Sequence, residues 1–197
     1  MPGTEAVYSF PGWKRAMDVL GSVIGLILLA IPMAIIASAI WFESGGPILI
    51  GQRRIGSRGS EYKMWKFRTL PPKTPQLSKA DLIAAGIRPR PLGQFLRRYS
   101  LDEFPQVLNV LIGDMSLVGP RPALFTQDDL VRLRRDAGIG DVRPGLTGLA
   151  QISGREDLTL EQKVALDVDY VKQLSPLSDL AILLRTTVAI LRARGSY

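Results

Sequence analysis

The chain has 197 residues, of which 46% are hydrophobic and 22% are charged, and its net charge is +7. It contains neither cysteine nor histidine, which excludes thiol nucleophiles, Ser-His-Asp triads, disulfides and metal sites built on those ligands. Covalent chemistry would have to use a carboxylate, hydroxyl or amine, and a catalytic metal would be a hard ion such as Mg²⁺. The positive charge favours an anionic partner, either a phosphorylated substrate or lipid head groups, over nucleic acid.

The uncharged segment 19–42 is longer than the ~20 residues that a helix needs to cross the hydrocarbon layer, so it predicts a membrane segment. Ala37-Ser38-Ala39 within it resembles a signal-peptide cleavage site. The apolar run is too long for the usual ~7–15-residue signal core and continues beyond that site. We therefore expect it to stay in the mature protein.

The topology of this segment depends on Pro32 and on the charges beside it. Pro32 removes a backbone hydrogen bond near the middle of the run, which bends or breaks a helix. Lys14 and Arg15 precede the segment and further basic residues follow it, and positive charge marks the cytoplasmic side. We expect a re-entrant helix broken at Pro32, in preference to a straight spanning helix. Residues 1–45 would form this membrane part and residues 46–197 a water-side domain.

The water-side domain begins with a predicted β-hairpin. Residues 48–50 and 61–69 read as strands around the turn-rich segment 56–60. On an extended strand Lys66 and Arg68 share one face, and aromatic residues occupy the other. The two cations could hold an anion or could simply be solvated.

Two predicted helices then meet at a pair of acids. Residues 92–99 have helical spacing, and Ser100-Leu-Asp-Glu103 has the form of a capping box that opens a second helix through Leu111. Asp102 and Glu103 would lie in its first turn, where backbone N–H groups stabilise carboxylates and bind phosphate. Acids in a first turn are also common as simple caps, so the local pattern leaves both roles open.

Three further segments lie on the surface or in turns. Residues 71–91 are rich in proline and basic residues and predict a surface excursion with a short helix at 78–85. Residues 126–137 predict a surface helix capped by Thr126. The glycines and flanking arginines of segment 143–155 suit a backbone cradle for phosphate, although such a segment is more often only a turn.

Two helices are predicted to close the chain. One covers residues 160–174, and the other begins at Ser175-Pro176 and runs to about Arg194. The last helix has a broad apolar face, so it could lie on the bilayer surface or be a core helix. The predicted fold class is α+β: a mainly helical, membrane-associated domain with a small β-hairpin and an N-terminal membrane helix.

Taken together, these segments resemble the bacterial sugar transferase family, the small monotopic polyprenyl-phosphate phosphoglycosyl transferases. The resemblance runs from about Lys14 to the C-terminus, except for the variable segment 71–91. The matching pieces, in chain order, are Lys14-Arg-Ala-Met-Asp18, Gly46-Pro47, Tyr62-Lys-Met-Trp-Lys-Phe-Arg68, Ser100-Leu-Asp-Glu103, Gly113-Asp-Met-Ser-Leu-Val-Gly-Pro-Arg-Pro122, Arg143-Pro-Gly-Leu-Thr-Gly148 and Gln151-Ile-Ser-Gly-Arg155.

The resemblance implies transfer of a sugar-1-phosphate from a UDP-sugar to polyprenyl (undecaprenyl) phosphate, with release of UMP. It places the reaction, with Mg²⁺, at the cytoplasmic face of the bacterial inner membrane in a monotopic enzyme. The resemblance implies that this reaction is the first step of lipid-linked glycan assembly, as in exopolysaccharide synthesis. The product would pass to downstream glycosyltransferases.

The resemblance also assigns roles by position. Asp102 would be the nucleophile that holds the phosphosugar covalently, and Glu103 would assist at the metal or in proton transfer. Both carboxylates are candidate Mg²⁺ ligands, and Pro32 matches the break in the membrane helix. The residues implied in substrate binding are Arg97, Arg121, Arg155, Lys66, Arg68 and Gln151.

Two other functions remain possible from the residues alone. A non-catalytic membrane-anchored module could recruit an anionic partner through the basic face, and Asp102→Asn would leave its function intact. A membrane-tethered nucleic-acid binder is the weaker alternative, because no recognised fold signature accompanies the charge.

Overall fold

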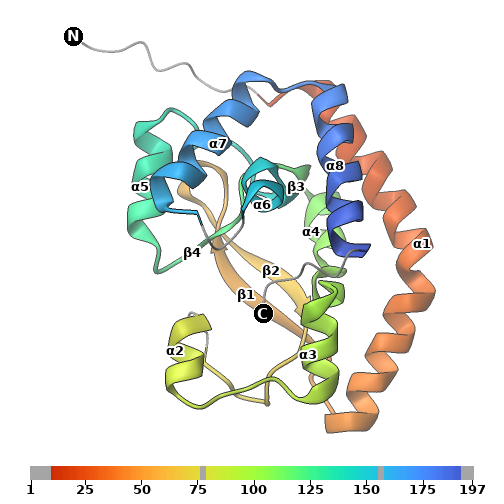
Figure 1. The fold of residues 1–197 in the computed structure, drawn as a ribbon. Coiled ribbons are helices and arrows are strands. Elements are labelled where there is room, and N and C mark those ends of the chain that lie inside the picture. The colour runs from red at the N-terminus through yellow and green to blue at the C-terminus, as the bar shows by residue number, and fades with distance from the viewer. Residues whose placement is uncertain (1–9, 76–78, 155–157, 192–197) are drawn as a thin grey trace.

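The computed structural model describes residues 10–75, 79–154 and 158–191 (Figure 1). Its helices within these ranges are α1 (Gly12–Ser44), α2 (Lys79–Ala84), α3 (Pro91–Arg98), α4 (Gln106–Ile112), α5 (Asp128–Asp136), α6 (Leu149–Ser153), α7 (Leu160–Lys172) and α8 (Pro176–Leu191). Its strands are β1 (Leu49–Ile55), β2 (Glu61–Phe67), β3 (Ser116–Val118), β4 (Ala123–Leu124) and β5 (Gly145–Thr147). Short 3-10 turns lie at Ser57–Gly59 and Leu101–Glu103.

The predicted β-hairpin is confirmed. β1 and β2 pair antiparallel from Leu49 opposite Phe67 to Ile55 opposite Glu61. The first strand therefore continues to Ile55, past the predicted end at residue 50, because every residue of β2 has a pairing partner in β1. β4 pairs antiparallel with β1 to give the sheet order β2-β1-β4, while β3 and β5 form a separate parallel pair.

The long apolar helix α1 is continuous and bent, not broken. It runs from Gly12 to Ser44 with Pro32 inside it, and Figure 1 shows it curving along the side of the domain. Proline removes one hydrogen bond of the ladder and bends a helix at that point. The turns beyond Pro32 stay helical because Ile36 and Ile40 are buried in a cluster with residues of the domain. The expected break at Pro32 is therefore absent, and α1 stays helical through that residue.

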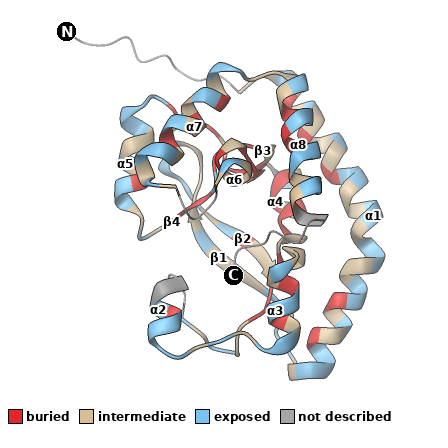
Figure 2. Ribbon diagram, in the orientation of Figure 1, coloured by how far each residue is buried: buried red, intermediate tan, exposed pale blue. Residues whose placement is uncertain are grey.

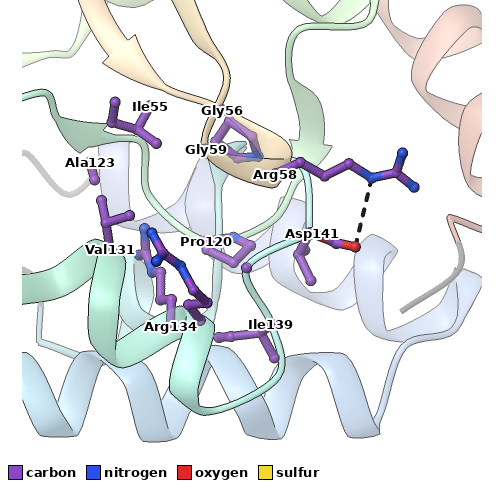
Figure 3. A pocket seen from close by; sticks show the side chains of 14 residues that line it. Ile55, Gly56, Arg58, Gly59, Pro120, Ala123, Val131, Arg134, Ile139 and Asp141 are labelled. Atoms are coloured by element: carbon purple, nitrogen blue, oxygen red, sulfur yellow. Dashed lines mark ion pairs between the residues drawn. The ribbon is translucent and has the colours of Figure 1, made fainter. Parts of the chain in front are cut away.

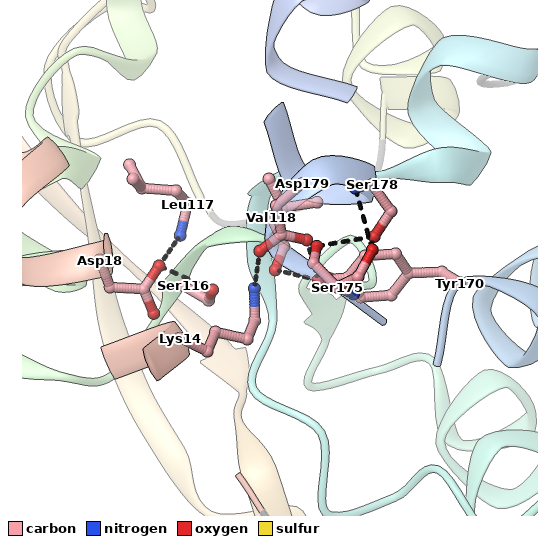
Figure 4. Close-up of polar contacts among 9 residues, drawn as sticks. All are labelled: Lys14, Asp18, Ser116, Leu117, Val118, Tyr170, Ser175, Ser178 and Asp179. Atoms are coloured by element: carbon pink, nitrogen blue, oxygen red, sulfur yellow. Dashed lines mark hydrogen bonds and ion pairs between the residues drawn. The ribbon is translucent and has the colours of Figure 1, made fainter. Parts of the chain in front are cut away.

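The N-terminal part of α1 is fixed to the domain by buried charges (Figure 4). The Lys14 ammonium donates to the Asp179 carboxylate of α8 at 2.6 Å, and this ion pair is almost completely buried. The other Asp179 oxygen accepts from the Tyr170 hydroxyl of α7 at 2.8 Å. Asp18 accepts from the hydroxyl of Ser116 and from the next backbone N–H of β3, each at 2.9 Å. These contacts join α1, α7, α8 and β3 at one point.

The same part of α1 packs closely on α4 and β3. The Arg15 guanidinium donates to the carbonyls of Val110 and Leu111 at 2.8 and 2.6 Å, near the C-terminal end of α4. A Cβ on Gly21 would lie 2.5 Å from a methyl carbon of Leu117, so glycine lets α1 approach β3. Gly21 thus serves the packing of α1 against the protein's own domain.

The C-terminal end of α1 is held by the same domain. The Arg68 guanidinium donates to the Gly45 carbonyl at 2.8 Å, to the Ser44 carbonyl at 3.3 Å and to the Ser44 hydroxyl. Arg90 donates to the Glu43 carbonyl at 3.1 Å. Carbonyls in the last turn of a helix have no partner inside the helix, so these arginines satisfy them. Both ends of α1 are therefore attached to one globular domain.

Two helices leave apolar side chains exposed. α1 is the helix, among the described residues, that is long and apolar enough to cross a membrane. α8 buries Ile182 against Val118 and Tyr170 but exposes the opposite side of the helix. Figure 2 shows the exposed surface along α1 and α8. The large exposed apolar side chains of the two helices are Leu20, Val23, Ile24, Ile27, Leu28, Ile31, Ile35, Trp41, Phe42, Leu177, Leu180, Leu184 and Val188.

The two C-terminal helices have the predicted starts. Thr159 and Gln162 form a reciprocal capping box at the start of α7. At α8 the Ser178 N–H donates to the Ser175 hydroxyl at 3.1 Å, and the Ser175 N–H donates to the Ser178 hydroxyl at 3.0 Å. α8 packs one face in the core, as a core helix would, and leaves its other, apolar face exposed.

Two other predicted caps are wrong. Ser100 has a φ of 55° and makes no side-chain cap, and α4 begins only at Gln106. The Glu103 carboxylate accepts from the Lys66 ammonium instead of capping, so the capping box does not form. α5 is preceded by Gln127 and not by Thr126, and the Gln127 side chain accepts from the Leu124 N–H of β4 instead of capping α5.

Candidate active site

The acid pair Asp102–Glu103 lies where β2, α3 and the turn before α4 meet. The Lys66 ammonium of β2 donates to Glu103 Oε1 at 2.7 Å and lies 3.9 Å from Asp102 Oδ2. The exposed fraction is 12% for the Lys66 side chain, 9% for Asp102 and 22% for Glu103. Two adjacent carboxylates therefore share one cation in a largely desolvated place.

Two predicted phosphate-binding arginines are near this pair. Arg97, at the end of α3, donates from Nε to the Thr69 hydroxyl at 2.7 Å, and its charge lowers the pKa of Asp102. Arg121 is exposed, and its charge lowers the pKa of Glu103. The structure thus brings Lys66, Arg97 and Arg121 together around the acids.

The environment pushes the pKa values of the two acids apart. Burial raises the pKa of Asp102, against the opposing charge of Lys66. Burial also acts to raise the pKa of Glu103, but the charges of Lys66 and Arg121 outweigh it and lower that pKa to about 2. The surroundings thus favour the ionised form of Glu103, whereas burial disfavours the ionised form of Asp102. A desolvated carboxylate of this kind suits a nucleophile better than a simple helix cap.

Two other predicted substrate-binding residues, Arg68 and Gln151, lie elsewhere. Arg68 is buried at the C-terminal end of α1, where it holds the carbonyls of Ser44 and Gly45. Gln151 belongs to α6 and donates to the Leu146 carbonyl at 3.4 Å. Arg155 lies outside the described residues. The described structure therefore groups half of the predicted substrate-binding residues at the acid pair.

The glycines of the predicted cradle bring backbones together. A Cβ on Gly145 would lie 2.1 Å from the Gly119 nitrogen, and one on Gly148 would lie 2.1 Å from the Gly119 oxygen. These are backbone atoms of the segment after β3, which cannot move aside. The glycines thus allow β5 to pack beside that segment, and they position Arg121, which follows it in the chain.

The acid pair offers a magnesium ion two carboxylates. No group of three or more acidic side chains suited to a metal lies among the residues that the structure describes. Mg²⁺ usually takes one or two protein carboxylates and completes its shell with water and substrate phosphate oxygens. Asp102 and Glu103 fit that mode of binding.

Sequence reasoning missed two side chains that line a small hollow beside Glu103. They are Arg54 of β1 and Gln106 of α4, and Arg121 also lines the hollow. Arg54 is one of several basic residues in this part of the sequence. It differs from its exposed neighbour Arg53 only in that successive residues of a strand point to opposite faces. Gln106, in the first turn of a short helix, carried no signal that could be read from one sequence.

A larger hollow lies on the other side of the segment 120–123 (Figure 3). It has a volume of about 430 Å³ and lies between the hairpin turn, α5 and the loop before β5. Arg58 and Asp141 form an ion pair at its rim at 3.7 Å. Arg134 lines it and is held by the buried Asp167 of α7 at 2.7 Å. None of the predicted site residues that the structure describes lines this hollow.

Comparison with known proteins gives a consistent result. Residues 9–193 match the family model described as bacterial sugar transferase. The chain is 37% identical to the exopolysaccharide production protein ExoY of Sinorhizobium fredii, covering 93% of this chain and 88% of that protein. It is 39% identical to the UDP-glucose:undecaprenyl-phosphate glucose-1-phosphate transferase of Caulobacter vibrioides, covering 93% and 72%. It is 36% identical to the undecaprenyl-phosphate galactose phosphotransferase of Salmonella typhimurium, covering 93% and 41%. The chain therefore belongs to the bacterial sugar transferase family.

Proposed function

We propose that this protein transfers a sugar-1-phosphate from a UDP-sugar to polyprenyl phosphate, through a phosphosugar bound covalently to Asp102. The names of the relatives support the overall reaction, since two of them are undecaprenyl-phosphate sugar-phosphate transferases. The observation that carries the mechanism is the Asp102–Glu103 pair, buried against Lys66. The product would be the first lipid-linked intermediate of a glycan such as an exopolysaccharide, which downstream glycosyltransferases would extend.

The chemistry proceeds in two displacements at one phosphorus atom. A carboxylate oxygen of Asp102 attacks the β-phosphorus of the UDP-sugar, and the bond from that phosphorus to the bridging oxygen breaks, which releases UMP. An oxygen of polyprenyl phosphate then attacks the same phosphorus, and the bond to Asp102 breaks. The product is a polyprenyl diphosphate sugar, and Asp102 returns to its carboxylate form.

The cations near the acids suit this reaction. Lys66, Arg97 and Arg121 would offset the negative charge that the diphosphate brings and that builds up on the leaving UMP. Glu103 holds Lys66 at 2.7 Å and so keeps that cation beside the attacking carboxylate. Asp102 and Glu103, with phosphate oxygens of the substrate, would hold Mg²⁺, which would neutralise further charge on the diphosphate.

The attachment of α1 supports a monotopic arrangement at the cytoplasmic face. A helix of 33 residues is about 50 Å long, more than the ~30 Å hydrocarbon layer requires. Its two ends contact one domain through Lys14 and Arg68, so a straight span would have to pull one end away. We infer that α1, bent at Pro32, enters one leaflet with its exposed apolar side chains. The exposed face of α8 would lie at the same interface.

The released nucleotide tests the proposed reaction. The detergent-solubilised protein is incubated with UDP-glucose or UDP-galactose, Mg²⁺ and polyprenyl phosphate, and nucleotides and extracted lipid are analysed. The proposal predicts UMP and a sugar diphosphate lipid, with both absent for Asp102→Asn. Release of UDP would show transfer of the sugar alone and would overturn the proposal. Absence of any turnover with a broad panel of UDP-sugars would favour the non-catalytic anchored module.

A further inference from the structure

Two residues that line the hollow beside Glu103 carry buried donors without an acceptor in the described part of the chain. Arg54 Nε and Gln106 Nε2 are buried, and neither has an acceptor among the described residues. The two outer nitrogens of Arg54 reach only the Pro122 carbonyl and the Gln52 amide oxygen, both at 3.3 Å. Gln106 itself is 2% exposed. Buried donors normally have partners, so these two indicate a missing acceptor.

The charge around the hollow points to an anionic acceptor. Arg54 and Arg121 both line it, and Glu103 supplies the carboxylate on its wall. That carboxylate already accepts the Lys66 ammonium at 2.7 Å. Two arginines therefore line the hollow beside one carboxylate, and that carboxylate is already paired with Lys66. An acceptor with negative charge would relieve the repulsion between the two guanidinium groups.

The size of the hollow limits what can enter. Its volume is about 10 Å³, which is about the space of one oxygen atom or one water molecule. The hollow can therefore receive a projecting oxygen of a larger ligand but not a whole sugar or base. A non-bridging phosphoryl oxygen has the right size and charge and accepts more than one hydrogen bond.

We propose that Arg54 and Gln106 form a phosphoryl-oxygen subsite, with Arg121 as its outer wall, next to the Asp102–Glu103 pair. This rests on the proposed function, since the oxygen belongs to a substrate phosphate. It adds two substrate-contacting residues on β1 and α4 to those implied by the sequence. The oxygen would come either from the diphosphate of the UDP-sugar or from the phosphate of the lipid acceptor.

The experiment compares Arg54→Gln, Arg54→Lys and Gln106→Met in the full-length protein. Formation of the phosphosugar adduct is followed at varied UDP-sugar without acceptor, and complete turnover is followed at varied polyprenyl phosphate. Arg54→Gln and Gln106→Met raise one half-saturating concentration about ten-fold or more, as loss of a charge-assisted or buried hydrogen bond predicts. Arg54→Lys keeps the charge without the Nε donor, so its effect is smaller.

The two titrations identify the source of the oxygen. If only the half-saturating concentration of the UDP-sugar rises, the oxygen belongs to the donor. If only that of polyprenyl phosphate rises, the oxygen belongs to the acceptor. Arg53→Gln is the matched control, because Arg53 is the exposed neighbour in β1 and is paired with Glu61 at 2.7 Å. It changes neither concentration.

Two results separate failure of this subsite from failure of the proposed function. If the wild-type protein turns over and Gln106→Met and Arg54→Gln keep both half-saturating concentrations, the hollow holds only water and the subsite is wrong. If the wild-type protein forms no adduct and no lipid product, the proposed function itself is wrong. Circular dichroism and a thermal melt show whether each variant is folded, and Arg54→Lys takes the place of Arg54→Gln if the latter is not folded.

Discussion

At the scale of single residues, the proposed nucleophile Asp102 and its neighbour Glu103 differ through their surroundings, since both carry a carboxylate. Burial raises the pKa of Asp102, whereas Lys66 and Arg121 overcome burial at Glu103 and lower its pKa to about 2. Lys66 lies within 3.9 Å of both carboxylates. Its charge therefore affects how much Asp102 is ionised at a given pH.

Replacing Lys66 should move the acidic limb of the activity profile to higher pH. As the proposed nucleophile, Asp102 would attack only as a carboxylate. Lys66→Met removes a charge that lowers the pKa of Asp102, so that pKa rises further. At any acidic pH less Asp102 is then ionised and the rate falls. The rate of adduct formation is measured against pH at saturating UDP-sugar. Lys63→Met, an exposed change in the same strand, should leave the profile in place. An unmoved limb for Lys66→Met would refute this role.

At the scale of elements, the positions of β5 and the segment after β3 depend on glycine. Gly145→Ala would place a Cβ 2.1 Å from a backbone nitrogen of Gly119. Overpacking of this kind costs about 1–3 kcal/mol or more, because backbone atoms cannot move aside. A thermal melt in detergent should show a clear loss of stability. Gly12→Ala is the control, since nothing lies within 4 Å of a Cβ there. Equal melting temperatures for the two variants would contradict the packing.

The elements also show what one sequence can predict. The hairpin, α7 and α8 were predictable because turn residues, periodicity and caps act over a few neighbours. The capping box at Ser100 failed because Glu103 pairs with Lys66, a residue of β2 that is distant in the chain. Arg68 was expected on the same strand face as Lys66, yet its guanidinium binds the carbonyl of Gly45 at the end of α1. Such outcomes depend on tertiary contacts that the local pattern does not contain.

At the scale of the whole molecule, α1 and the water-side domain form one body. The buried Lys14–Asp179 pair is the clearest test of this connection. Lys14→Met would leave the Asp179 carboxylate buried without its cation, which costs about 3–5 kcal/mol. The double change Lys14→Met with Asp179→Leu should recover part of that loss, and thermal unfolding measures both. Arg53→Gln breaks an exposed pair and should cost at most about 1 kcal/mol. If Lys14→Met lowers the free energy of unfolding no more than Arg53→Gln does, the Lys14–Asp179 pair does not fix α1 to the domain.

The same attachment predicts that both ends of α1 lie on one side of the membrane. The chain has no cysteine, so single cysteines can be introduced without removing others. Gly12→Cys and Ser60→Cys should be labelled from the same side in oriented vesicles by a reagent that does not cross the bilayer. Labelling from opposite sides would show that α1 crosses the membrane.

The covalent step through Asp102 is the central claim, and intact-mass measurement tests it most directly. The protein is incubated with a UDP-sugar and Mg²⁺ but no lipid acceptor, and its mass is compared with that of Asp102→Asn. The account predicts an added mass of one phosphosugar on the wild-type protein, one UMP released per adduct, and neither for Asp102→Asn. An adduct of the same mass on Asp102→Asn would contradict the account, because another residue would then be the nucleophile.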